Sequence, residues 1–160
     1  VKGQEIMDAG RVYFSSGTKL DLTKSMSFHN FDEYCVVPIV HGDIELASYD
    51  FWAVGTNCCD QKELFRCGEY ANIHARSGLR YMDQVKQEHF LSAVKQAEAA
   101  FGIKAQHPLF FTWAQDPLAM INTKVSRAWH FYYVGVGTFF FTNLFGVIVA
   151  LMGFSRLGHL

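Results

Sequence analysis

The chain has 160 residues and a formal net charge of −1, with 50% hydrophobic, 16% aromatic and 18% charged residues. The near-neutral charge argues against a protein that binds nucleic acid through bulk positive charge, and the apolar content excludes an intrinsically disordered chain. All 15 acidic residues and 13 of the 14 basic residues precede Phe131. The composition therefore excludes a purely soluble globule and predicts a soluble domain over residues 1–116 followed by a membrane segment.

The first half of the soluble domain shows the alternation of apolar and polar residues that is typical of strands. We expect strands over residues 11–15, 20–28, 34–40 and 44–54, with a turn at 41–43. Residues 55–80 are rich in Gly, Asn, Cys and Arg and predict a cross-linked loop. The fold class that follows is α+β: a small, disulfide-stapled, β-rich domain with one or two helices, followed by a single transmembrane helix.

Four cysteines lie in the soluble domain, at Cys35, Cys58, Cys59 and Cys67. Their even number within a short stretch predicts two disulfides. A bond between the adjacent Cys58 and Cys59 would strain its ring, so we expect Cys67 to pair with one of these two and Cys35 with the other. Two such bonds would stabilise a small domain and indicate an oxidising compartment.

Other uses of the cysteines stay open. The four thiols could form a tetrahedral zinc site, with His29, His41 or His74 as further ligands. Adjacent ligands at Cys58 and Cys59 fit such a site poorly, and the sequence has no CxxC, so we expect no metal. Free structural thiols and thiol–disulfide chemistry at the vicinal pair are the remaining interpretations.

His74, Arg76 and Arg80 lie close in sequence to Cys67 and Glu69. Such a group of residues could form an ionic cluster or an active site, and we interpret it as a loop held by salt bridges. The sequence contains no G-x-S-x-G, H-E-x-x-H or P-loop pattern. We therefore predict no catalytic residues and no enzymatic activity.

A helix should begin after Asp83, which is a good N-cap, and end at Gly102. Its apolar face is expected to comprise Val85, Phe90, Val94, Ala97 and Phe101. A brief apolar run follows at residues 109–113. The Asp116-Pro117 pair predicts a second helix start, which continues through a juxtamembrane stalk over residues 117–130.

Residues 131–154 form a run of 24 residues without a charge. A membrane helix needs about 20 apolar residues. Trp129, Tyr132 and Tyr133 lie at the start of the run, where amphipathic rings favour the headgroup region. This pattern predicts one transmembrane helix over residues 131–154 and a short tail over residues 155–160.

Small residues recur along this span at the spacing of one helix face. A helix with such a face can approach another helix closely in lipid, where apolar burial alone gives no drive to associate. Asn143 adds an amide that favours a hydrogen-bond partner over hydrocarbon. We therefore predict that the span packs on a partner helix through Gly135, Thr138, Thr142, Gly146, Ala150 and Gly153.

His130 lies at the membrane boundary, where an imidazole could ligate a metal centre such as the magnesium of chlorophyll. A solvated interfacial histidine is the alternative, and His159 is a weaker candidate ligand. Lys124 and Arg127 before the span, against Arg156 after it, weakly favour a cytoplasmic-like N-terminal side. Disulfides favour an exoplasmic or lumenal position for the soluble domain, and we give the cysteines more weight than this count of basic residues.

Several strings between residues 21 and 117 resemble an expanded family of dinoflagellate transmembrane proteins. They are DLTKSMSFHNFDEYCVVPIV, YDFWAVGTNCC, FRCGEYANIHARSGLR and HPLFFTWAQDP. The family pattern includes four cysteines, which this sequence matches. Ile73 departs from it, because a proline is expected before His74.

The resemblance implies an algal lineage with complex plastids. On that basis we expect a non-catalytic accessory subunit of photosystem I with its light-harvesting antenna, in the thylakoid membrane with a lumenal domain. The expected partners are core or antenna subunits and the lipid bilayer, not nucleic acid, with chlorophyll or carotenoid as candidate cofactors at the span. A membrane-anchored thiol–disulfide enzyme and a structural subunit of a mitochondrial or endomembrane complex are the alternatives.

Overall fold

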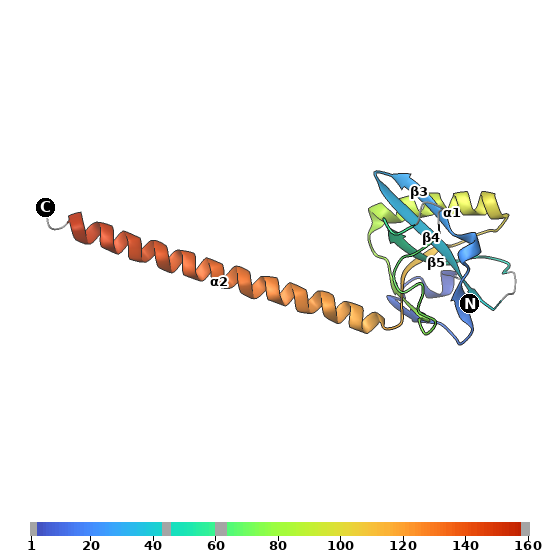
Figure 1. Ribbon diagram of the computed structural model, residues 1–160, viewed down its shortest axis with the longest axis horizontal. Helices are drawn as coiled ribbons and strands as arrows, with labels where there is room; N and C mark the ends of the chain where they lie inside the picture. The colour runs from blue at the N-terminus through green and yellow to red at the C-terminus, as the bar shows by residue number, and fades with distance from the viewer. Residues whose placement is uncertain (1–2, 43–45, 60–63, 158–160) are drawn as a thin grey trace. The chain divides into compact units, whose positions relative to one another are not determined.

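The computed structural model describes residues 3–42, 46–59 and 64–157 (Figure 1). The chain divides between Pro117 and Leu118 into two compact units, a mixed α+β domain and a unit built on one long helix. The predicted α+β class with a long apolar C-terminal helix is confirmed. Because the two units are separate bodies, each is described by itself.

The described residues of the first unit form seven strands, one long helix and two short 3-10 turns, η1 and η2. In chain order the elements are η1 Gly3–Ile6, β1 Arg11–Tyr13, β2 Thr18–Leu20, η2 Leu22–Lys24, β3 Met26–Asn30, β4 Asp32–His41, β5 Phe51–Thr56, β6 Ser77–Arg80, α1 Gln84–Phe101 and β7 Leu109–Ala114. The second unit is α2, whose full extent is Pro117–Leu157.

The strands form one sheet in the order β1-β6-β7-β5-β4-β2, with β3 also paired to β4. Strands β2 and β3 follow one another along the same edge of β4, pairing with its second and first halves. The β5–β7 pair is parallel and the other pairs are antiparallel. A parallel pair needs a long crossover, and this one carries the disulfide loop, β6 and α1.

Strand β4 is buried on both faces, which explains its uninterrupted apolar sequence. Tyr34 and Val36 face a core shared with α1, whereas Cys35 and Val37 face a second core beneath the disulfide loop. Alternation along a strand sends neighbouring side chains to opposite faces. The domain therefore has three layers: α1, the sheet, and the cross-linked loop together with the N-terminal segment.

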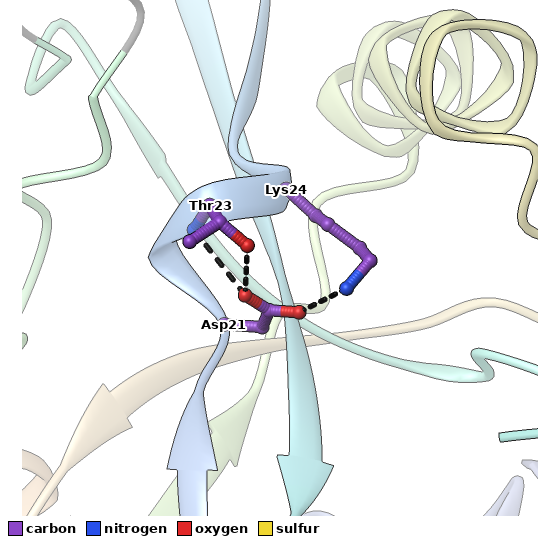
Figure 2. A network of polar contacts seen from close by, with 3 residues as sticks. All are labelled: Asp21, Thr23 and Lys24. Carbon is purple, nitrogen blue, oxygen red and sulfur yellow. Dashed lines mark hydrogen bonds and ion pairs between the residues drawn. The ribbon is translucent and has the colours of Figure 1, made fainter. Parts of the chain in front are cut away.

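The strand predicted over residues 20–28 is wrong as one element. The carboxylate of Asp21 accepts hydrogen bonds from the backbone N–H and the hydroxyl of Thr23 and pairs with Lys24 (Figure 2). These contacts fold residues 22–24 into η2 and divide the stretch into β2 and β3. Burial alone would raise the pKa of Asp21, but its contacts with Lys24 and Thr23 outweigh burial and lower that pKa.

The strand predicted over residues 44–54 is also wrong over residues 46–50, because β5 begins only at Phe51. The preceding Asp50 is buried, and its carboxylate anchors three segments. It accepts hydrogen bonds from the Ser48 hydroxyl and from the backbone N–H groups of Gly3, Gln106 and His107. In the predicted turn, His41 ends β4 and Gly42 has a φ of 64°, whereas residues 43–45 lie outside the described chain.

Helix α1 begins and ends as predicted. The Asp83 side chain accepts from the Lys86 N–H, and Gly102 takes the left-handed conformation after the last turn. Its predicted face is correct at Phe90, Val94 and Ala97, which are buried. The face is wrong at its ends: Val85 is 72% exposed and Phe101 is 37% exposed, while Ala93 is buried instead.

The loop predicted over residues 55–80 is wrong at its two ends. Its first residues complete β5, and Ser77–Arg80 forms β6, which joins β1 to β7. The Ser77 hydroxyl donates to the carbonyl of Ala114, 2.6 Å away, and so ties β6 to the end of β7. The apolar run at residues 109–113 becomes β7, a central strand of the sheet.

Candidate functional site

The four cysteines meet on the face of the sheet opposite α1. Cys35 bonds to Cys59 and Cys58 bonds to Cys67, with Cα–Cα distances of 5.9 and 5.1 Å. This is one of the two pairings left open by the sequence. The loop after β5 thus supplies three cysteines and β4 supplies one. The Cys35–Cys59 bond fastens the crossover to β4, and the Cys58–Cys67 bond closes a loop within the crossover.

Strand β5 leaves room for this cluster at one position. Gly55 lies beside Cys35 in the β4–β5 register. A Cβ atom at Gly55 would lie 2.5 Å from the Cβ of Cys67 and 2.6 Å from the Sγ of Cys58. The Cys58–Cys67 disulfide therefore packs directly on the backbone of β5, and sequence reasoning missed this role of Gly55.

In this structure the cluster has no thiol available for chemistry, because all four cysteines are disulfide-bonded. The Sγ atoms of Cys35, Cys58 and Cys67 lie within 4.8 Å of one another, a spacing that would suit a metal ion if the cysteines were reduced. None of the expected histidines joins them within the described residues. His41 instead contacts the Ser15 hydroxyl through Nδ1 at 3.4 Å.

The expected ionic cluster around Glu69 is wrong. Its carboxylate accepts hydrogen bonds from the side-chain amide of Asn72 and from the backbone N–H of Gln115. The backbone N–H of His74 donates to the Asn72 side chain, and the Arg80 guanidinium lies 5.5 Å from the centre of the Phe111 ring. Amide groups, rather than ion pairs with Arg76 or Arg80, therefore bind the Glu69 carboxylate in the described part of this loop.

Helix α2 is the one described helix that is long and apolar enough to cross a membrane. Its most apolar window has a mean hydropathy of 2.0 and no buried residues. The predicted stalk and span form a single uninterrupted helix, and the first residues of the predicted tail also belong to it. Residues 158–160, including His159, lie outside the described chain.

The small residues predicted to pack on a partner helix lie on one side of α2. Thr138, Thr142, Gly146 and Ala150 are successive members of an i, i+4 row. Gly135 and Gly153 lie near the two ends of this row, but Phe139 stands beside it, one turn after Gly135. The part of this helix face with the smallest side chains therefore runs from Thr142 to Gly153. We call Thr138, Thr142, Gly146 and Ala150 the small-residue row.

The polar groups of this segment form hydrogen bonds within the helix. The hydroxyls of Thr138 and Thr142 donate to backbone carbonyls three and four residues earlier. The Asn143 amide donates to the carbonyl of Phe139, 2.7 Å away. These bonds let the segment lie in hydrocarbon without exposing free hydroxyl donors. Binding of a partner helix then depends on how closely the two helices pack.

The aromatic side chains expected at the membrane boundary form one patch. The Trp129 ring lies 5.8 Å from the ring of Tyr132 and 5.8 Å from that of Tyr133. His130 is exposed and its ring lies 6.2 Å from the ring of Phe131. Pigment ligation by His130 stays a prediction.

The sequence matches no protein-family model, and comparisons with curated proteins and with solved structures find no match.

Proposed function

We propose that this protein is a non-catalytic accessory subunit of a membrane protein complex, held there by packing of α2 on a neighbouring helix. The single observation that carries the proposal is the small-residue row on an exposed apolar helix. The described contacts of the chain leave this row uncovered, and a Cβ atom added at Gly146 would meet nothing within 4 Å. A second helix could therefore approach the backbone closely at this point.

The first unit fits a structural role in the same complex. Two disulfides and a sheet with a core on each face make a small domain rigid, and rigid domains suit binding surfaces because little conformational freedom is lost on association. The cysteines that could have served a thiol–disulfide enzyme are engaged with one another in this structure.

We further propose photosystem I with its light-harvesting antenna as the complex, in the plastid thylakoid membrane with the disulfide-bonded domain in the lumen. The resemblance to dinoflagellate transmembrane proteins supports the lineage, and the disulfides support an oxidising compartment. Chlorophyll or carotenoid beside α2, with His130 as a ligand, belongs to the same proposal.

Fractionation of mildly solubilised native membranes tests this function. A native gel read by absorbance and by mass spectrometry should place the chain in the band that contains photosystem I and its antenna. Co-migration with a mitochondrial or endomembrane complex would instead assign the subunit to that complex and its compartment. Recovery of the chain alone, free of any complex, would contradict the accessory role.

A further inference from the structure

The β3–β4 hairpin ends in an unusual residue for a tight turn. Phe31 separates Asn30 from Asp32, which pair with each other in the register. Its φ is 60°, and its side chain is 100% exposed. The left-handed region disfavours residues with a bulky side chain, whereas Gly and Asn adopt it readily. Phe31 therefore adopts a strained conformation and gains no packing within the described domain in return.

The turn is also braced from outside the hairpin. The Asn57 side chain accepts from the Glu33 N–H and donates to the Asp32 carboxylate, each over 2.9 Å. The Asn57 N–H donates to the Glu33 carbonyl over 2.8 Å. Asn57 also directly precedes the cysteine pair whose second member bonds to β4.

This bracing holds the tip where it extends past its neighbour. Strand β5 ends at Thr56 opposite Tyr34, so the tip continues beyond the last β4–β5 pair (Figure 1). The aromatic side chain is thus presented by a rigid support and loses little freedom on binding.

The charge around the tip indicates what Phe31 contacts. Asp32 and Glu33 follow it directly, and neither strand of the hairpin, β3 or β4, contains a Lys or Arg. Anionic lipid surfaces attract basic segments, so this tip is poorly suited to them. A protein pocket with an apolar floor and Lys or Arg at its rim would complement both the ring and the carboxylates.

We propose that Phe31 is the anchor by which the soluble domain binds a partner protein, with its ring in an apolar pocket bordered by basic side chains. Strain at an exposed position is a feature of functional sites, and a buried aromatic anchor at the centre of an interface is a common hot spot. This contact goes beyond the proposed function because it uses no residue of α2, so either proposal can fail without the other.

Photo-crosslinking of the full chain in native membranes tests the contact. The variant Phe31→p-benzoylphenylalanine should label one polypeptide, in a peptide where apolar residues adjoin Lys or Arg. The matched control places the same group at Ile73, which is 82% exposed on the disulfide loop and should not label that peptide. Labelling of lipid alone, labelling shared with the control, or no labelling would overturn the proposal.

A second variant separates binding from folding. Phe31→Asn should raise the unfolding midpoint of the detergent-solubilised chain by about 4 °C, because asparagine tolerates the left-handed conformation. It should also lower recovery of the cross-linked polypeptide with the chain by about tenfold, whereas Phe31→Tyr and Ile73→Asn should retain recovery. A lower midpoint for Phe31→Asn would show that Phe31 stabilises the fold, and unchanged recovery would show that its ring is not needed for binding. Either result would overturn the proposal.

Discussion

Gly55 on β5 and Cys67 in the crossover lie so close that a Cβ atom on Gly55 would be 2.5 Å from the Cβ of Cys67. This contact joins the sheet to the disulfide cluster without an intervening side chain. The position of the crossover on the sheet therefore depends on the glycine as much as on the cysteines.

Replacement Gly55→Ala should destabilise the domain by about 1–3 kcal/mol, because the added methyl group overpacks the cluster. Urea unfolding followed by fluorescence of the buried Trp52 and Trp113 measures this change. The matched control is Gly10→Ala, where an added Cβ meets nothing within 4 Å. Equal stability of the two variants would contradict the close packing at Gly55.

The two disulfides should contribute unequally to stability. Cys35–Cys59 spans a sequence separation of 24 and Cys58–Cys67 a separation of 9. Loop-closure entropy then gives about 3.5 kcal/mol for the longer loop and about 2.5 kcal/mol for the shorter one. The paired variants Cys35→Ala/Cys59→Ala and Cys58→Ala/Cys67→Ala, compared by urea unfolding, should follow that order. Non-reducing peptide mapping of the wild type, with fragmentation between Cys58 and Cys59, checks the pairing itself, and a Cys35–Cys58 linkage would refute it.

Asn57 should be costly to replace for two separate reasons. Its side chain makes two hydrogen bonds to the hairpin tip, and its φ is 57°. Asn57→Ala loses both bonds and also strains the backbone, so we expect a loss of about 2–3 kcal/mol. Asn57→Gly removes only the bonds and should cost about 1 kcal/mol less. Indistinguishable thermal midpoints for the two variants would argue against the left-handed conformation.

Acid should weaken the domain through Asp50. Burial alone would raise the pKa of Asp50, but hydrogen bonds from Ser48 and from backbone N–H groups outweigh burial and lower it below the ordinary 3.8. Because the pKa of Asp50 is lower in the folded state than in the unfolded state, the ionised carboxylate stabilises the fold at pH values above the unfolded pKa. This stabilisation is lost as pH falls through the folded pKa. Stability should therefore decline as pH drops below about 4.

The Asp50→Asn variant isolates this pH dependence. It should be less stable than the wild type near pH 7, and the difference should shrink as pH falls below about 4. Glu88→Gln, at an exposed position on α1, is the control and should leave the acid profile unchanged. A stability difference that is the same at pH 3 and pH 7 would contradict the linkage to Asp50.

Elements with a long, regular pattern could be predicted from sequence. The caps at Asp83 and Gly102 bound α1 correctly, and the strand expected over residues 34–40 lies within β4. The division at Asp21 could not be predicted, since alternation continues through the turn and only the contacts with Thr23 and Lys24 break it.

The disulfide pairing, β6 and the exposed Phe31 could not be predicted from sequence, because each depends on how distant segments meet in the fold. Two disulfide pairings satisfied the sequence equally, because the choice depends on which vicinal side chain faces β4. β6 was missed because its glycine and arginine resemble a loop, although Ser77 and its neighbours pair along β7. Phe31 gave no turn signal, since phenylalanine is a typical strand residue.

The most direct test of the accessory role compares two glycines of α2 that are equally unobstructed in the chain. An added Cβ meets nothing within 4 Å at Gly146 or at Gly137, but only Gly146 belongs to the small-residue row. Both variants, Gly146→Leu and Gly137→Leu, add the same apolar side chain to the surface of the helix. On native gels of solubilised membranes, Gly146→Leu should lose co-migration with the complex by about tenfold and Gly137→Leu should retain it. Equal co-migration of the two variants would contradict the proposal that α2 docks through this row.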